Sequence, residues 1–304
     1  MEMIRTYDWH FCADGSPRGY IESPQLRELW FHTGTACNLA CPFCLEGSKP
    51  GDDRLQLMTL ADVRPFIDEA AALGVERFSF TGGEPFVARQ FPQILDYALQ
   101  HAPALVLTNG TSPLLQRMQQ IEPLRDKPHP ANFRISIDFA DQKAHDAGRG
   151  EGTFEQSFEA LRQLVARGFH VSVARQQESA DEDPQAVDDK YRQLFAEQDL
   201  PEDLPIIWFP DFGTPFSHRD HPEITENCMT EFQTAETRAQ FMCAFSRMVI
   251  KKDGAMRVYA CTLVDDDPQY DLGGTLKDSL RPRVMMKHHR CFSCFKYGAS
   301  CSEI

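Results

Sequence analysis

The sequence predicts an α/β fold: a partial (β/α)6 TIM-like barrel followed by a small C-terminal unit. Short runs rich in Val, Ile, Leu and Phe alternate with longer segments of helical periodicity, as in parallel sheets buried on both faces. Six such units are too few for an eight-stranded barrel. Of the 10 cysteines, nine fall into two groups and Cys12 stands apart. None lies between Cys44 and Cys228, which indicates a second structural unit near the C-terminus.

The expected elements follow one another in a regular order. Strands are expected over residues 29–33, 77–81, 104–108, 133–138, 169–174 and 204–209. Helices are expected between Thr59 and Gly74, then over residues 91–99, 113–121, 154–165 and 185–197. Thr59 and Thr153 have the residue type and position of N-caps. Residues 250–259 are expected to form a hairpin that turns at Asp253-Gly254.

Length and charge limit the possible partners. A chain of 304 residues can form one large domain, or a large and a small one. Its net charge of −14 disfavours nucleic acid or an anionic membrane as partner. The sequence has no apolar run near the ~20 residues of a membrane span, and its N-terminus has no signal-peptide core. A cytoplasmic protein is therefore expected.

A cysteine-rich segment follows the first expected strand. Cys37, Cys41 and Cys44 have the spacing C-x3-C-x2-C, and Pro42 and Gly47 favour a loop around them. Thiolates suit a soft metal centre. Closed zinc sites and cubane clusters usually take four protein ligands, so three would leave one iron of a [4Fe–4S] cluster open for chemistry. A zinc knuckle or a chance grouping is the alternative.

Polar residues also follow the next three strands. In parallel α/β folds the site lies at the carboxyl ends of the strands. The glycines of the first group would let the backbone approach a ligand closely, and its glutamate could accept a hydrogen bond from an ammonium group. The groups are Gly82, Gly83 and Glu84, then Thr108 and Asn109, then Ser136 and Asp138.

The cysteine spacing, with Phe43 before the last cysteine, resembles the radical S-adenosylmethionine (radical SAM) family. Gly82-Gly83-Glu84, Thr108-Asn109-Gly110 and the segment from Ser136 to Phe154 extend the resemblance over the N-terminal two-thirds of the chain. It implies a [4Fe–4S] cluster whose open iron binds S-adenosylmethionine, and a flavodoxin- or ferredoxin-type reductant. A 5′-deoxyadenosyl radical would then abstract hydrogen from the substrate.

The resemblance also implies roles for individual residues. The Gly82–Glu84 turn would hold the amino group of S-adenosylmethionine, Ser136 its carboxylate or ribose, and the Phe43 backbone its adenine. The remaining residues expected to bind the cofactor are Thr108, Asn109, Asp138 and Arg149. Asp138 could equally be a cap, and Arg149 could equally form an ion pair on a loop.

The second cysteine group contains a possible four-thiolate site. Cys243 and Cys261 flank the expected hairpin, and Cys291 and Cys294 form a Cys-x2-Cys pair. Four thiolates can close a zinc site or a cubane cluster. The spacing resembles the twitch domain, a shortened relative of the SPASM domain, and implies an auxiliary [4Fe–4S] cluster. Cys228 and Cys301 are unplaced: each could replace a ligand, act as a catalytic thiol or be buried and inert.

This interpretation divides the chain into an extension (1–26), a radical SAM barrel (27–210) and a twitch-like or SPASM-like domain (211–304). Residues 287–290 could bind substrate anions or form a basic solvated face. The acidic stretches 181–189 and 265–267 are expected to be solvated turns. No catalytic residue is assigned, because any of Asp211, His218, Arg219 and His221 could be a general base.

The expected function is oxidation (dehydrogenation) or rearrangement of a small biosynthetic intermediate, such as a sugar or cyclitol. Modification of a peptide or protein side chain is the alternative. A non-catalytic iron–sulfur electron carrier or redox sensor is a second alternative. It is disfavoured because an electron carrier needs no carboxylate that binds an ammonium group, the role expected of Glu84.

Overall fold

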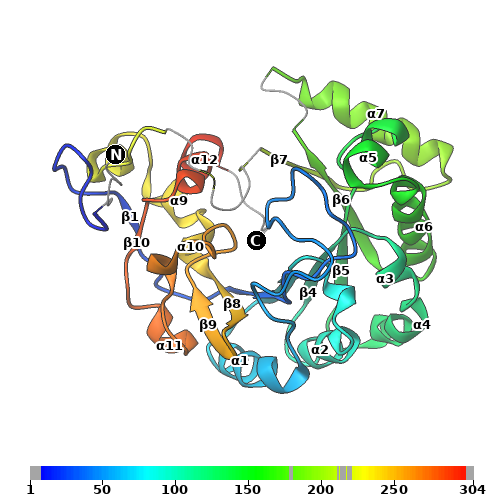
Figure 1. Ribbon diagram of the computed structural model, residues 1–304, viewed down its shortest axis with the longest axis horizontal. Coiled ribbons are helices and arrows are strands. Elements are labelled where there is room, and N and C mark those ends of the chain that lie inside the picture. Colours follow the sequence, from blue (N-terminus) through cyan, green and yellow to red (C-terminus); the bar gives the residue numbers. More distant parts are fainter. Residues whose placement is uncertain (1–7, 178–180, 211, 213–216, 218–220, 299–304) are drawn as a thin grey trace.

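A curved sheet forms the centre of the molecule, with helices along its outer side (Figure 1). The computed structural model describes residues 8–177, 181–210, 212, 217 and 221–298. The strands are β1 (Tyr20–Ile21), β2 (Glu28–His32), β3 (Arg77–Thr81), β4 (Ala104–Thr108), β5 (Ala131–Ser136), β6 (His170–Gln176), β7 (Ile206–Phe209), β8 (Ser246–Lys252), β9 (Ala255–Tyr259) and β10 (Val284–Met285). The main sheet has the order β7-β6-β5-β4-β3-β2-β8-β9, and β2 to β7 are parallel. The predicted parallel α/β architecture is confirmed.

Helices alternate with the strands from β2 to β7, and further short helices follow in the C-terminal region. The α-helices are α1 (Leu60–Ala72), α2 (Phe91–Ala98), α3 (Ser112–Leu115), α4 (Met118–Ile121), α5 (Gln142–Arg149), α6 (Thr153–Ala166), α7 (Pro184–Glu197), α8 (Glu226–Glu231), α9 (Ala235–Ala239), α10 (Met242–Phe245), α11 (Leu276–Ser279) and α12 (His289–Tyr297). Three short 3₁₀ segments complete the set: η1 (Pro85–Val87), η2 (Glu122–Asp126) and η3 (Pro268–Tyr270).

Two helix predictions need correction. Residues 113–121 form two short helices, α3 and α4, because Arg117 between them leaves the helical conformation (φ −109°, ψ 6°). Thr153 does not cap α6. It is the first residue of that helix, and Gly152 occupies the N-cap in the left-handed conformation. The Thr59 capping box with Asp62 is present as predicted.

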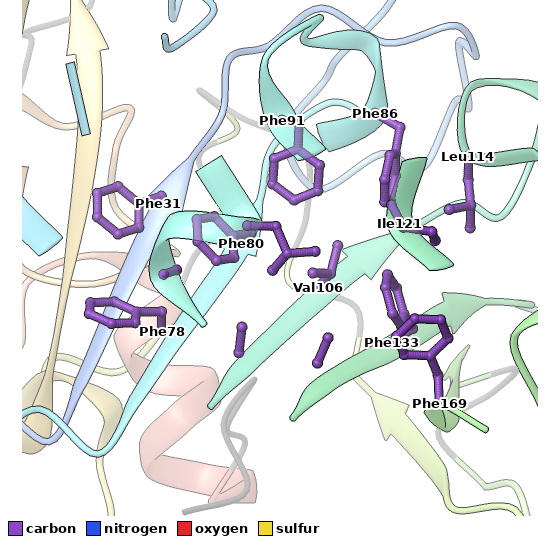
Figure 2. Packing of buried hydrophobic residues seen from close by; sticks show 14 of the residues in the cluster. Phe31, Phe78, Phe80, Phe86, Phe91, Val106, Leu114, Ile121, Phe133 and Phe169 are labelled. Carbon is purple, nitrogen blue, oxygen red and sulfur yellow. The ribbon is translucent and has the colours of Figure 1, made fainter. Parts of the chain in front are cut away.

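The main hydrophobic core lies between the sheet and the outer helices. Figure 2 shows its aromatic side chains, which come from successive strands and from the segment after β3. Phe31 stacks on Phe80 with ring centroids 5.4 Å apart, and Phe91 meets Phe80 edge-on at the same distance. This packing holds the strands in register, so that their carboxyl ends meet at one edge of the sheet.

The predicted hairpin is present, but it belongs to the main sheet. β8 and β9 pair antiparallel around Asp253 and Gly254, both at positive φ (51° and 77°), as a two-residue hairpin turn requires. β8 also pairs with β2 in parallel, Glu28 opposite Ser246. The sheet therefore continues past residue 210 into the region expected to form a separate unit.

A second hydrophobic cluster surrounds the elements after residue 221. It contains buried Cys243 and Cys291, with Cys228, Cys261 and Cys294 packed against it. The segment before residue 27 joins this region, since β1 pairs with β10 and Trp9 meets Tyr270 edge-on at 4.8 Å. Within the ranges that the structure describes, no helix has the length and apolar character needed to cross a membrane.

Candidate active site

A cavity of about 230 Å³ lies at the carboxyl ends of β3 to β7. It brings together all the residues predicted to bind the cofactor except Glu84. Those that line it are Cys37, Cys41, Phe43, Cys44, Gly82, Gly83, Thr108, Asn109, Ser136, Asp138 and Arg149. Three residues at the end of β6, which sequence reasoning missed, complete one side: Ala174, Arg175 and Gln176. Their position at a strand end was the available signal.

The cysteine loop is closed at its base by the chain on either side. Ala36 bridges to Lys49, and the Thr35 hydroxyl donates to the Asp52 carboxylate at 2.9 Å. Inside the loop, the Cys44 amide donates to the Cys41 carbonyl at 3.1 Å, and the Leu39 amide donates to the Cys37 thiol at 3.3 Å. The three thiols are thus carried on a short, internally bonded loop.

Gly82 and Gly83 are needed for packing against this loop. A Cβ on Gly83 would lie 2.4 Å from the Ala36 carbonyl oxygen, and one on Gly82 would lie 2.7 Å from the Thr33 hydroxyl. The Gly83 amide donates to the Gly34 carbonyl at 2.8 Å. The prediction that these glycines admit a ligand is therefore incomplete, because their first role is to let two backbone segments meet.

The Glu84 carboxylate is occupied by the protein itself. It is buried, and it accepts hydrogen bonds from the Thr108 hydroxyl (2.8 and 3.0 Å), the Asn109 amide (2.8 Å) and the Phe86 amide (3.1 Å). Burial raises the pKa of Glu84 to about 7, and these donors oppose that rise. The side chain joins the ends of β3 and β4, and it does not line the cavity as the prediction required.

Asn109 connects the end of β4 to the cysteine loop. Its side-chain amide lies 3.9 Å from the Cys37 sulfur and donates to the Asn38 side chain at 3.0 Å. Asn38 in turn donates to the Thr111 hydroxyl at 2.9 Å. Asn38 was missed by sequence reasoning, although its place beside Cys37 in the loop could have pointed to it.

Helix α5 holds Phe43 from the other side of the loop. A Cβ on Gly148 would lie 2.5 Å from the Phe43 ring, so this glycine gives the ring its space. The Arg149 guanidinium lies over the same ring, 5.9 Å from its centroid. Arg149 also forms a bidentate ion pair with Asp138. Arg149 therefore forms an ion pair, from helix α5 and not from a loop, and that pair lines the cavity, so binding of the cofactor by Arg149 stays a prediction.

The donor set of the loop suits iron. Burial raises the pKa of Cys37 to about 12 and also raises the pKa values of Cys41 and Cys44. Thiolates so placed need a compensating cation, which bound iron supplies. Among the described residues, no three cysteine, histidine or carboxylate side chains lie close enough to hold one metal ion. This applies equally to the C-terminal cysteines, so the choice between zinc and an iron–sulfur cluster stays a prediction at both sites.

The four C-terminal cysteines line a second, small cavity. Cys243 lies on α10, Cys261 two residues after β9, and the Cys-x2-Cys pair of Cys291 and Cys294 on α12. Burial raises the pKa of Cys243 to about 12 and that of Cys291 to about 11, and it also raises the pKa of Cys261 well above its usual value. The Tyr270 hydroxyl lies 3.6 Å from the Cys291 sulfur. The four cysteines that were predicted to be ligands therefore line one cavity, and metal binding by them stays a prediction.

Two buried arginines contact the segments that carry these cysteines. Arg247 donates to the carbonyls of Cys243 at 2.8 Å, Ser246 at 2.7 Å and Ser279 at 3.0 Å. Arg290 donates to the carbonyls of Leu45 at 2.9 Å, Leu263 at 3.1 Å and Phe212 at 3.4 Å. Leu45 follows Cys44, so Arg290 links the cysteine loop of the first cavity to the lining of the second.

Several charged residues expected on the surface are internal. Asp265 is buried, and burial raises its pKa to about 7. Asp266 lies 3.1 Å from His288, and Lys287 donates to Asp267 at 3.0 Å. The predictions of a solvated turn at 265–267 and of a basic solvated face at 287–290 are therefore wrong, because the two stretches partner each other.

The candidate general bases and the two unplaced cysteines either lie away from the first cavity or fall outside the described residues. His221 stacks near Phe292, 6.0 Å between ring centroids, and does not line the cavity. Cys228 accepts from the Thr225 hydroxyl at 3.3 Å, half-buried outside both cavities. Asp211, His218, Arg219 and Cys301 lie outside the described residues.

Comparison with known proteins agrees with this geometry. The sequence model of the family described as "Radical SAM superfamily" matches residues 31–175. Mycofactocin maturase MftC of Mycolicibacterium smegmatis is 33% identical over 135 residues, which cover 44% of this chain and 33% of the maturase. The chain thus spans about a third of the length of the curated relatives that it matches first.

Solved structures share the fold at low identity. The structure of anSMEcpe with bound AdoMet has a TM-score of 0.60 at 14% identity, covering 88% of this chain and 82% of that one. Streptococcus suis SuiB bound to its precursor peptide SuiA has a TM-score of 0.52 at 15% identity, covering 84% and 64%.

The superfamily uses a [4Fe–4S] cluster and S-adenosylmethionine, and the matched segment contains the three cysteines and the strand ends that line the first cavity. Residues 31–175 of this chain belong to the radical SAM superfamily.

Proposed function

We propose that this radical SAM enzyme cleaves S-adenosylmethionine reductively and abstracts hydrogen from an unactivated C–H bond. The observation that carries the proposal is the cavity that joins the Cys37–Cys44 loop to the ends of five neighbouring strands, β3 to β7. When bound, the cluster and S-adenosylmethionine supply an electron and a 5′-deoxyadenosyl radical. The protein's own residues have to bind, orient and enclose them.

The residues divide this work as follows. Cys37, Cys41 and Cys44 would hold three irons, and the backbone of Gly82 and Gly83 would face the amino group. The side chains at the ends of β4 and β5 would orient the rest of S-adenosylmethionine. The Asp138–Arg149 ion pair would form part of the cavity lining around it. Glu84 is assigned to joining β3 and β4, since its carboxylate already accepts hydrogen bonds from three groups.

The four C-terminal cysteines are proposed to hold an auxiliary [4Fe–4S] cluster in a twitch-like region. A centre with four cysteine ligands has no open position for substrate, so it would take up the electron left after hydrogen abstraction. That favours oxidation, or a rearrangement with no net redox change, over simple hydrogen transfer. A flavodoxin- or ferredoxin-type protein is proposed as reductant of the first cluster.

The substrate is proposed to be a small biosynthetic intermediate. The volume of the first cavity, about 230 Å³, does not measure the size of the substrate, because the cluster and S-adenosylmethionine are assigned to the same space. A peptide side chain is the second candidate. Two comparisons favour this second candidate: a relative is named a maturase, and the SuiB structure contains a precursor peptide. Mass spectrometry distinguishes the two candidates by showing whether a peptide or a small metabolite loses two hydrogen atoms.

Cleavage of S-adenosylmethionine is the primary test. The protein is reconstituted anaerobically with iron and sulfide, reduced with dithionite and given S-adenosylmethionine. We expect 5′-deoxyadenosine from the wild type and from Cys12→Ala, whose buried thiol lies outside both cavities. Cys41→Ala should produce none. A fully loaded, reduced wild type that releases no 5′-deoxyadenosine contradicts the proposal.

Iron content tests the auxiliary cluster separately. Two cubane clusters predict about eight irons per chain, and Cys261→Ala should lower this to about four. If Cys261→Ala leaves the iron content unchanged, the four-cysteine assignment is wrong, whereas the proposal for the first cavity stands.

A further inference from the structure

Arg247 is a buried cation that lacks a carboxylate partner. It lies on β8 at 0% exposure, and its hydrogen bond to the Cys243 carbonyl brings it to the segment that carries one of the four cysteines. Its three hydrogen bonds all go to carbonyl oxygens, and its Nη2 has no partner among the described residues. The Cys243 and Cys261 side chains lie near enough to Arg247 to favour its charged form, and no carboxylate of the described residues does so.

A charge in such a place requires a counter-charge. Burying an isolated guanidinium is costly, and buried charges in proteins are paired or bound to metal centres. The carbonyl groups around Arg247 carry only partial charges. Four thiolates around an iron–sulfur core leave a net charge of about −2, which would supply the missing anion at the place where the structure needs it.

We propose that Arg247 is the charge-compensating and positioning residue of the four-cysteine centre. It holds Cys243 through that residue's carbonyl at 2.8 Å and keeps a fixed positive charge next to the segment that carries this cysteine. The inference rests on the auxiliary cluster of the proposed function and adds the residue that sets its electrostatics. Because reduction adds one negative charge to the centre, this cation favours the reduced form and raises the reduction potential.

The test isolates the auxiliary centre. Cys37, Cys41 and Cys44 are all replaced by Ala, so that iron at Cys243, Cys261, Cys291 and Cys294 is measured alone. In this background Arg247→Met removes the charge, and Arg247→Lys retains it on a different side chain. Arg134→Met is the matched control, since Arg134 is also fully buried but lies on β5, several strands from β8.

The readouts are iron and sulfide per chain, and the midpoint potential in a dithionite titration followed by electron paramagnetic resonance. We expect Arg247→Met either to lose iron or to shift the reduction equilibrium at least tenfold toward the oxidised form, about 59 mV for one electron. Arg247→Lys should keep the iron with a smaller shift, and Arg134→Met should leave the potential unchanged.

Two results would overturn the inference. One is Arg247→Met with wild-type iron and potential. The other is loss of iron in Arg247→Lys as complete as in Arg247→Met, which would leave the side chain's shape and not its charge as the cause. Failure of the proposed function is recognised separately, because the triple-Ala background would then contain no iron–sulfur centre even with Arg247 intact.

Discussion

Individual side chains at the first cavity are placed by close contacts that leave no spare room. Phe43 is held between α5 and the cysteine loop, where Gly148 and Arg149 both touch its ring. His145, on the same helix, is fully buried, with neither ring nitrogen hydrogen-bonded within the described residues. The packing around Phe43 gives a prediction for ligand binding, and the burial of His145 gives one for the pH dependence of stability.

Gly148→Ala should weaken binding of S-adenosylmethionine. The new Cβ would lie 2.5 Å from the Phe43 ring, and overpacking of this kind costs about 1–3 kcal/mol. We expect the Kd measured by equilibrium dialysis to rise about tenfold, with iron content retained. Adding Phe43→Leu relieves the clash, so the double variant should bind better than Gly148→Ala alone. Equal affinity of wild type and Gly148→Ala would refute the assigned contact.

His145 should make the protein less stable in mild acid. Burial lowers the pKa of His145 to about 4, against 6.5 in an unfolded chain. Below pH 6.5 His145 is therefore protonated in the unfolded state but still neutral in the folded state. The free energy of unfolding then falls as the pH drops toward 4. The loss attributable to this residue is about 2 kcal/mol between pH 7 and pH 5.

The measurement is urea unfolding at both pH values, for wild type and His145→Leu. The variant should lose less stability than the wild type by about the same amount. Identical pH dependence in the two proteins would show that His145 is not the titrating group.

Helices and strands are positioned by interactions that cross from one element to the next. Helix α6 has Gly152 at its N-cap, which has no side chain to accept from the first amides. The Asp146 carboxylate, from α5, accepts from the Gly152 amide at 3.0 Å and the Phe154 amide at 2.8 Å. One helix thus supplies the cap of the next, which ties α5 and its cavity residues to the outer layer.

Asp146→Ala should destabilise the protein by about 1–2 kcal/mol, the usual cost of losing an N-cap. The neighbouring Glu151→Ala is the control, because Glu151 is exposed. Thermal unfolding followed by circular dichroism would measure both. A Glu151→Ala variant as unstable as Asp146→Ala would point to a general charge effect, and the cap would not then be the cause.

At the scale of the whole molecule, the two cysteine sites are joined. Arg290 donates to a carbonyl beside Cys44 and to another just after Cys261, while β8 pairs with β2, the strand that leads into the cysteine loop. The C-terminal region is therefore continuous with the barrel through both hydrogen bonds and sheet pairing (Figure 1).

Arg290→Met should destabilise the protein and lower iron content at both sites. Hydrogen bonds from a charged group contribute about 1.5–3 kcal/mol each, so losing these contacts should cost about 3 kcal/mol or more. Urea unfolding and iron analysis measure the effect, with exposed Arg281→Met as the matched surface control. If Arg290→Met unfolds at the wild-type urea concentration, the proposed link between the sites is absent.

Local patterns in the sequence were sufficient for the parts of the fold that depend on neighbours along the chain. The alternation of apolar runs and amphipathic segments predicted the parallel strands, and Asp253-Gly254 predicted the hairpin turn. Cysteine spacing and strand ends predicted most of the lining of the first cavity. These features depend on backbone periodicity, turn conformation and the rule that parallel strands end at one edge.

Contacts between segments that are distant in the sequence became known only from the tertiary structure. Sequence could not show that β8 pairs with β2, that the Glu84 carboxylate is consumed by Thr108 and Asn109, or that Arg247 is buried beside thiols. A charged residue has the same sequence appearance whether it faces water or a buried counter-charge. Its surroundings are set by pairing and packing across the whole chain, and the energy of a buried charge depends on those surroundings.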